Sequence, residues 1–227
     1  AKISGFTRRY GYLQKDVNPF TGEVYFPEFI DLFFRSGQQV KDRLIRDLHL
    51  TNYSASDYDV LDKLYRKIYL QKVRGTEQMV IHRSADIQKV NKRTDKIAIS
   101  YTKLESPEIA EESFDLVVLA TGFKNTGTRD HEEQIHPLLS DLKRYLSIDQ
   151  DGNLPVNLDY SLQLKNRETS TLFLNGLCES SHGMGDAGSF SLLALRSQRI
   201  VESLDRLLKE KNAIYNGDYD VLFSNVF

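Results

Sequence analysis

The chain of 227 residues has no tryptophan, one cysteine (Cys178), two methionines and five prolines. One cysteine cannot form an internal disulfide framework, which is typical of a protein from a reducing compartment such as the cytoplasm. No apolar run approaches the roughly 20 residues of a transmembrane helix, and no signal peptide is visible. The cysteine and histidine residues show no spacing typical of a zinc site. The sequence therefore predicts neither a membrane protein nor a metal centre.

Neither sign of charge is in excess: the chain has 30 basic and 32 acidic residues and a net charge of −2. This balance provides no basic patch for nucleic acid or a membrane surface. The length allows one or two domains with a sizeable core. No Ser/His/Asp or Cys/His pattern indicates nucleophilic catalysis, so no catalytic side chain is nominated.

The most informative stretch is the apolar run from Leu116 to Ala120, which ends in Thr121-Gly122. A short apolar run before a turn predicts a strand buried on both faces. In open α/β sheets, ligands bind outside the carboxyl ends of such strands. Ala120, Thr121 and Gly122 are therefore candidate cofactor contacts, since small residues permit close approach. A core strand without any ligand would have the same pattern.

Hydrophobic spacing predicts the remaining elements. Helices are expected from Pro27, interrupted near Gly37, and over 56–72, 135–145 and 189–211. Strands are expected at 79–81, 87–90, 97–101, 116–120 and 171–175, with a turn at 149–152. The tail after Asn216 is left unassigned. The prediction is an α/β fold with a β-meander and a long C-terminal helix.

Three further blocks carry a family signature: Asn18–Pro27 (NPFTGEVYFP), Thr51–Ser54 (TNYS) and Ser181–Asp186 (SHGMGD). With the Ala120-Thr121-Gly122 strand, they resemble the flavin-dependent ornithine/lysine N-monooxygenases of siderophore synthesis. The resemblance covers nearly the whole chain. It implies a flavoprotein monooxygenase with two dinucleotide-binding domains, using FAD and NADPH to hydroxylate a primary amine with O₂.

That family needs phosphate-binding G-x-G-x-x-G loops. No such motif follows a strand here, and the chain does not begin with Met. The resemblance therefore implies the C-terminal part of a longer enzyme, whose N-terminal portion is a partner. Residues 1–75 would belong to the NADPH domain and 76–123 would form the meander and return strand of the FAD domain. Residues 124–227 would form a substrate-side insertion and the end of the FAD domain.

The resemblance also implies roles for individual residues. Arg8 matches the contact with the NADPH 2′-phosphate, which suits a guanidinium, although Arg9 is adjacent. Thr51 and Asn52 match the nicotinamide-ribose contact, and Asn52 also lines the amine pocket. Helix N–H groups near His182, Gly183, Met184, Gly185 and Asp186 are expected to face the flavin. For His182 itself a structural role is preferred.

Gly22 departs from the family pattern. Ornithine-binding members have an asparagine there, which holds the α-carboxylate end of the substrate. Three explanations remain open: another residue substitutes for it, the substrate is a diamine such as putrescine or cadaverine, or the position has drifted. Two other functions also stay open: a Baeyer–Villiger or sulfur-oxidising monooxygenase, and a non-catalytic fragment. A homo-oligomer is possible.

Overall fold

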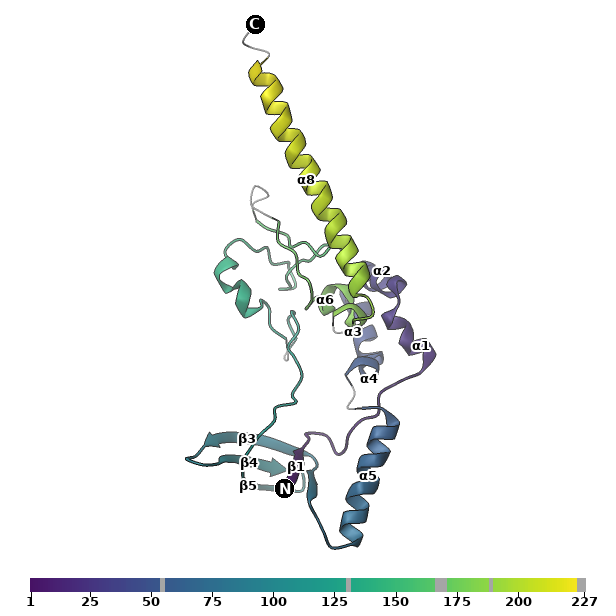
Figure 1. Ribbon diagram of the computed structural model, residues 1–227, viewed down its shortest axis with the longest axis vertical. Coiled ribbons are helices and arrows are strands. Elements are labelled where there is room, and N and C mark those ends of the chain that lie inside the picture. Colours follow the sequence, from purple (N-terminus) through teal and green to yellow (C-terminus); the bar gives the residue numbers. More distant parts are fainter. Residues whose placement is uncertain (54–55, 130–131, 166–170, 188–189, 224–227) are drawn as a thin grey trace. The chain divides into compact units, whose positions relative to one another are not determined.

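The computed structural model describes residues 1–53, 56–129, 132–165, 171–187 and 190–223, with backbone only for 187 and 211–223 (Figure 1). They form two compact units. Unit 1 comprises Ala1–Val17 and His49–Gly122, and unit 2 comprises Asn18–Leu48 and Phe123–Phe227. Each unit is described by itself below.

Unit 1 contains a pair of parallel strands, β1 (Ile3–Phe6) and β2 (Met79–His82), with Ile3 opposite Met79. Parallel strands require a long crossover, and helix α5 (Tyr58–Val73) lies within it and packs against β2. The single turn α4 (His49–Asn52) precedes α5. This arrangement brings the carboxyl ends of β1 and β2 to the same edge.

The other sheet of unit 1 is an antiparallel meander of β3 (Ala85–Lys92), β4 (Ile97–Lys103) and β5 (Ser106–Phe114). The central strand β4 holds the buried residues, because it has a neighbour on each side. Ala85, Ile99 and Tyr101 form a core cluster, against which Phe6, Phe114 and Val117 pack.

Unit 2 begins with α1 (Pro19–Gly22), the 3₁₀ turn η1 (Glu23–Tyr25), α2 (Pro27–Arg35) and α3 (Gln38–Asp47). Pro27 occupies the first turn of α2, where its missing N–H is not needed. Ile30 and Phe33 form the buried face of α2. Ser36 ends the helix in an extended conformation before Gly37.

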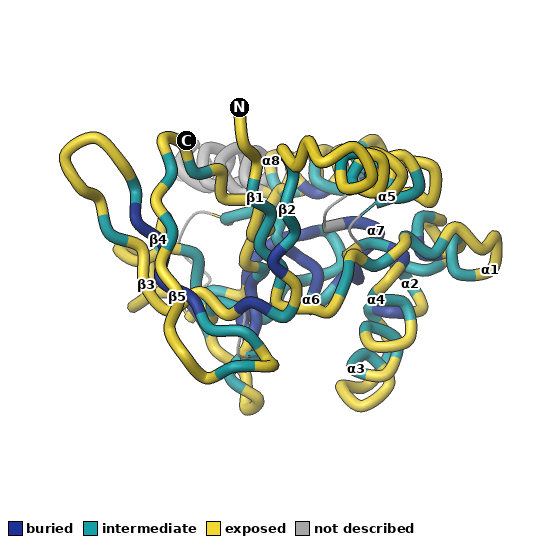
Figure 2. The backbone as a smooth tube through the Cα atoms, turned by 90° about the horizontal axis from the view of Figure 1, so that it is seen from below, coloured by how far each residue is buried: buried dark blue, intermediate teal, exposed yellow. Residues whose placement is uncertain are grey.

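The rest of unit 2 has the 3₁₀ helix η2 (Pro137–Leu142), the short helices α6 (Glu179–His182) and α7 (Met184–Ala187), and the long α8 (Leu193–Phe223). Between them the chain is held by isolated bridges such as Val156 with Leu162. Leu146, Leu154 and Leu162 form its core cluster. Figure 2 colours α6 as buried or intermediate, and residues 184–186 of α7 are buried.

Most of the predicted elements are confirmed. Helix α2 begins at Pro27, a second helix follows Gly37, and α5, β2, the meander and the turn at 149–152 are present. The long C-terminal helix is also present, although its predicted start at Ser189 lies outside the described residues. None of the described helices is sufficiently long and apolar to cross a membrane.

The predicted strand from Leu116 to Ala120 is wrong for this structure. The segment forms no strand, and Leu116, Val118 and Leu119 are 77–78% exposed. A strand needs a hydrogen-bonded neighbour, and burial on both faces needs a packed layer on each side; the described residues pair with 116–120 in no strand and leave Leu116, Val118 and Leu119 uncovered. Similarly, 171–175 forms only one bridge, from Phe173 to Ser161, and the helix expected at 135–145 shortens to η2.

Candidate functional site

An arginine-rich edge lies where β1 and β2 end. The segments that follow β1 and β2 continue side by side. Thr7 N donates to the His82 oxygen (3.1 Å), and Ser84 N donates to the Arg9 oxygen (3.0 Å). Arg8 and Arg9 follow β1 and are exposed, and Arg83 follows β2. Three cations therefore gather at the carboxyl edge of a parallel strand pair, where open α/β sheets bind their ligands.

Arg83 was not predicted from the sequence. Its guanidinium lies 5.3 Å from the centre of the Tyr10 ring, and both residues line a cavity of about 260 Å³. α5 supplies the apolar wall of this cavity through Leu61, Leu64 and Ile68. The available signal was the position of Arg83 two residues after the predicted strand 79–81, which corresponds to the position of Arg8 two residues after β1.

Thr51 and Asn52 lie in α4 of unit 1. Thr51 is buried and Asn52 is partly exposed. The turn is fastened to the segment after the arginine-rich edge, since Asp16 N donates to the Leu50 oxygen (3.1 Å) and Gln14 pairs with Ser56. Ser54 lies outside the described residues. Arg8 and Asn52 thus both belong to unit 1, in its two separate stretches Ala1–Val17 and His49–Gly122.

Ala120, Thr121 and Gly122 are all exposed, and Gly122 has a φ of +81°. A positive φ is a conformation that glycine adopts without strain. The three residues thus present open backbone to an incoming group. Whether that group is the cofactor stays a prediction.

Gly22 lies at the junction of α1 and η1 in unit 2. The Asn18 side chain caps α1 by accepting from Phe20 N at 2.9 Å. Gly22 has a φ of −64° and a ψ of −17°, and a Cβ placed on it would meet nothing within 4 Å. Neither backbone conformation nor packing therefore requires glycine here.

In contrast, the segment from His182 to Asp186 (the HGMGD segment) is buried in unit 2. The imidazole of His182 stacks on Tyr160 with ring centres 4.2 Å apart. Its Nε2 lies 3.3 Å from the Leu158 carbonyl and its Nδ1 lies 2.8 Å from Ser181 Oγ. A carbonyl only accepts, so Nε2 carries the proton and Nδ1 accepts from the hydroxyl. Burial lowers the pKa of His182 to about 4.

This environment favours a neutral, structural imidazole, as expected, and excludes His182 as a base exposed to solvent. Met184 and Asp186 are equally buried. The side chains of the HGMGD segment therefore face the interior of unit 2, and Gly183 and Gly185 are buried as well.

Residues 183–188 match the letters G-x-G-x-x-G without following a predicted strand. In the structure the part that is described, 183–187, follows the short helix α6 and not a strand, unlike a phosphate-binding loop. Gly183, with a φ of +89°, packs against Phe29 and Phe33. Gly185 packs against the backbone of Val24. The glycines thus serve close protein packing.

A buried carboxyl group precedes this segment and was also missed. Glu179 is 3% exposed, and its Oε2 accepts from Asn125 Nδ2 at 2.6 Å. Burial raises the pKa of Glu179 to about 7. The contact ties the start of α6 to the residues following Gly122.

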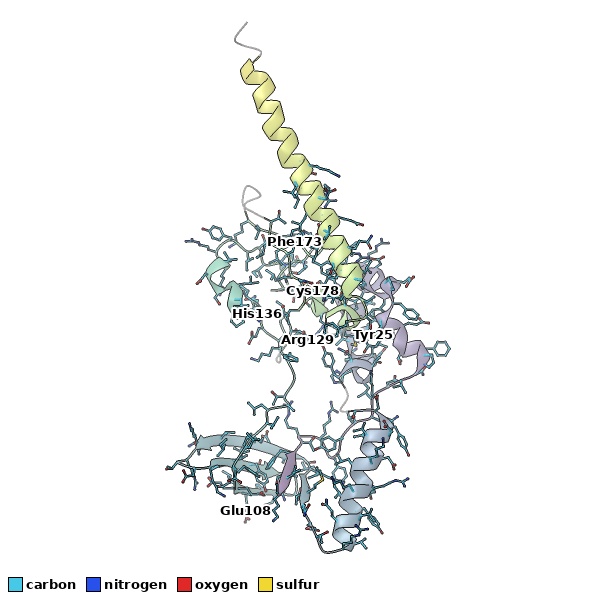
Figure 3. The ribbon with its side chains drawn as sticks, viewed as in Figure 1. Tyr25, Glu108, Arg129, His136, Phe173 and Cys178 are labelled. Carbon is cyan, nitrogen blue, oxygen red and sulfur yellow. The ribbon has the colours of Figure 1, made fainter. Side chains whose placement is uncertain are left out.

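The site residues thus fall on both units. Within unit 2, the Gly22 block and the HGMGD segment meet through Val24 and Gly185. Figure 3 shows Cys178, the residue before α6, beside the base of α8. Among the described residues, no group of three or more His, Cys, Asp or Glu side chains is placed to hold a metal ion.

Comparison with known proteins extends these observations. The family model for L-lysine 6-monooxygenase/L-ornithine 5-monooxygenase matches residues 1–125. The L-ornithine N(5)-monooxygenase of Pseudomonas aeruginosa is 32% identical over 199 residues, which are 87% of this chain and 42% of that protein. The chain therefore spans less than half the length of this curated relative.

Solved structures agree. The ornithine N-hydroxylase of Kutzneria sp. 744, described with reduced FAD, NADP⁺ and L-ornithine, has a TM-score of 0.78 and 27% identity over 90% of this chain and 48% of its own. The L-lysine 6-monooxygenase of Pseudomonas syringae has a TM-score of 0.68 and 29% identity over 90% of this chain and 47% of its own. These matches confirm the α/β fold. The chain belongs to the L-lysine 6-monooxygenase/L-ornithine 5-monooxygenase family.

Proposed function

We propose that this chain is part of an FAD- and NADPH-dependent monooxygenase that N-hydroxylates a primary amine in siderophore biosynthesis. The amine is ornithine, lysine or a related diamine. The chemistry consumes O₂ and NADPH with one proton, and yields the hydroxylamine, NADP⁺ and water. Family membership and the ligands of the Kutzneria structure support this proposal.

The observation that carries the proposal is the arginine-rich edge of unit 1. Arg8 and Arg83 follow the two parallel strands and stand where a dinucleotide binds in such sheets. A guanidinium pairs with a phosphate dianion through charge-assisted hydrogen bonds. In this proposal Arg8 holds the 2′-phosphate of NADPH and Arg83 supplements it. Asn52, whose carboxamide donates and accepts, binds the nicotinamide ribose and faces the amine.

The described residues fit FAD only in part. FAD supplies the oxygen-activating chemistry when bound. The exposed residues Ala120, Thr121 and Gly122 suit contacts with such a ring system. The HGMGD segment, which is buried in unit 2, is assigned to the flavin on the family resemblance. However, the packed glycines at 183 and 185 leave no cradle for a pyrophosphate. We therefore assign the phosphate-binding loops to the remainder of a longer enzyme.

The chain's own residues would bind, orient and shield the reactants. No side chain needs to act as a nucleophile, and burial makes both candidates inert: it lowers the pKa of His182 to about 4 and raises that of Cys178 to about 12. We further propose that the enzyme acts in the cytoplasm, where a single unpaired thiol stays reduced, and that homo-oligomers form.

The proposal is tested with the full-length enzyme loaded with FAD. NADPH oxidation and hydroxylamine formation are measured with ornithine, lysine, putrescine and cadaverine, and a ketone and a thioether serve as control substrates. At least one amine should give hydroxylamine in proportion to the NADPH consumed. Oxygenation of the ketone or thioether alone, or no hydroxylamine from any amine, would contradict it.

A further inference from the structure

Tyr160 contacts both ends of the HGMGD segment. Its ring, which is completely buried, stacks on His182 with an interplanar angle of 19°. Its hydroxyl donates to Asp186 Oδ1 at 3.2 Å. The short stretch between these two residues carries the conformationally free Gly183 and Gly185. One side chain therefore fastens a glycine-containing stretch at its first and last residues.

The backbone at Tyr160 is itself in an uncommon conformation. Its φ is +67°, in the left-handed region that is strained for a bulky side chain. Two main-chain hydrogen bonds hold it there: Tyr160 N donates to the Asn157 oxygen (2.8 Å), and Leu174 N donates to the Tyr160 oxygen (2.9 Å). Glycine or asparagine would suit this backbone better. A large aromatic residue at such a position indicates that its side chain is needed.

The contact with Asp186 is electrostatically important. Arg196 approaches the same carboxylate at 3.6 Å through Nη1, which also donates to the Asp186 main-chain oxygen (2.9 Å). Of the described residues, only Tyr160 places a hydrogen-bond donor within 3.5 Å of the carboxylate oxygens. Burial raises the pKa values of Asp186 and Tyr160, and the phenol stays protonated and can donate. Loss of this donor would leave a buried carboxylate poorly satisfied.

We propose that Tyr160 is a positioning residue that fixes the conformation of the buried HGMGD segment, which the proposed function assigns to the flavin. The inference rests on the proposed function for the identity of the ligand. The contacts with His182 and Asp186 themselves do not depend on it. The competing explanation is that Tyr160 only fills the core of unit 2, in which case its hydroxyl has no local effect.

The test compares Y160F with Y145F by hydrogen exchange in the full-length protein, with and without FAD. Y160F keeps the stacked ring and removes only the hydroxyl. Tyr145 belongs to the same unit, is 37% exposed and packs beside Arg144, which makes it a matched control. We expect the amides of residues 183–186 to exchange about tenfold faster in Y160F, the lower end of what a hydrogen bond to a charged group contributes. Y145F should leave them unchanged.

In the wild-type protein FAD should slow the exchange of these same amides, and Y160F should lose most of that protection. Faster exchange spread evenly over unit 2, or no change at 183–186, would reduce Tyr160 to a core residue and overturn the proposal. Absence of FAD protection in the wild type would overturn it as well. If Y160F does not fold, D186N removes the charge at the other end and should loosen the same amides. A negative hydroxylamine assay would contradict the proposed function while leaving these exchange results unaffected, so the two failures are distinguishable.

Discussion

Gly185 packs directly on the backbone of Val24, so closely that a Cβ at position 185 would overlap with the Val24 carbonyl group. The HGMGD segment thereby packs against η1 at a residue only two positions from Gly22, the proposed substrate-side position. Overlap with backbone cannot be relieved by a side-chain rotation, so one of the two segments must move.

We therefore expect G185A to lower the unfolding free energy by about 1–3 kcal/mol, the usual range for overpacking. G22A is the matched control: Gly22 has helical dihedral angles and open space around it, so the change should be neutral or stabilising by up to about 1 kcal/mol. Urea-unfolding midpoints measure both effects. Equal midpoints for the two variants would contradict the packing described for Gly185.

Glu179 predicts a pH dependence of stability. Its pKa is raised by burial from 4.5 to about 7, so the native state binds this proton more tightly than the unfolded chain. The contribution of protonated Glu179 to the unfolding free energy is therefore fully present below about pH 4.5 and is lost as the pH rises through about 7. Relative to E179Q, the wild type should lose about 3 kcal/mol of unfolding free energy across this window.

His182 acts in the opposite direction, since its pKa is lowered to about 4 and its stabilising effect is lost as the pH falls from 6.5 towards 4. It is present in both proteins and cancels in the comparison. E202Q, which changes an exposed carboxylate, serves as the control. A difference between wild type and E179Q that stays constant from pH 4.5 to 8 would show that Glu179 titrates normally.

The arginine-rich edge predicts a preference between nucleotides in the full-length enzyme. R8A should raise the KM for NADPH about 10–100-fold and leave that for NADH nearly unchanged, because a charge-assisted phosphate contact contributes about 1.5–3 kcal/mol. R83A should shift the same ratio in the same direction. R74A, at the exposed end of α5, is the control. Equal losses with both nucleotides would remove these arginines from the phosphate site.

The role proposed for Asn52 predicts that this residue keeps NADPH oxidation coupled to hydroxylamine formation. N52A removes the ribose contact, so NADP⁺ should sit loosely and water should reach the reacting oxygen. Hydrogen peroxide would then replace hydroxylamine as the product. The measurement is the peroxide yield per NADPH consumed. A ratio equal to that of the wild type would indicate that Asn52 is only a loop residue.

Gly22 reports on the substrate. Because a Cβ at position 22 meets no atom within 4 Å, G22N tests the missing head-group contact without crowding the backbone. With ornithine or lysine, G22N should strengthen substrate binding by the contribution of one hydrogen bond, about 0.5–1.5 kcal/mol, and so lower the KM. With a diamine, G22N should leave the KM unchanged. We expect the wild type not to favour ornithine. A tenfold preference in kcat/KM for ornithine over lysine and both diamines would refute this.

The sequence predicted the elements whose signal is local. Pro27 with Phe29 and Phe33, the stripe of α5 and the alternation of β4 each have a period that the backbone follows. The prediction of a strand at Leu116–Ala120 failed, because an apolar run indicates a segment suited to burial but does not identify the elements that would cover it. β5 was missed because acidic residues occur on both of its faces, Glu112 opposite the core residue Ile99 and Glu111 on the other face, so no apolar alternation marks the strand.

The candidate site was predictable only where a motif could be read in order. Arg8, Asn52 and the HGMGD segment could be named from their blocks, although only the structure showed that the side chains of the segment point inward. The sequence could not identify Tyr160, Arg83 and Glu179 as site residues. Each contacts partners that lie at least 20 positions away or on a neighbouring strand, and no local pattern distinguishes them.

Cys178 gives this chain a built-in chemical probe. Its thiol is buried, and its pKa is raised to about 12, so almost none of it is thiolate at neutral pH. It is also the one cysteine in the sequence, so any reaction with a thiol reagent must report an opening around α6. The rate at which a thiol reagent labels the unmodified protein would therefore measure local opening next to the HGMGD segment, without a fluorophore or an engineered cysteine.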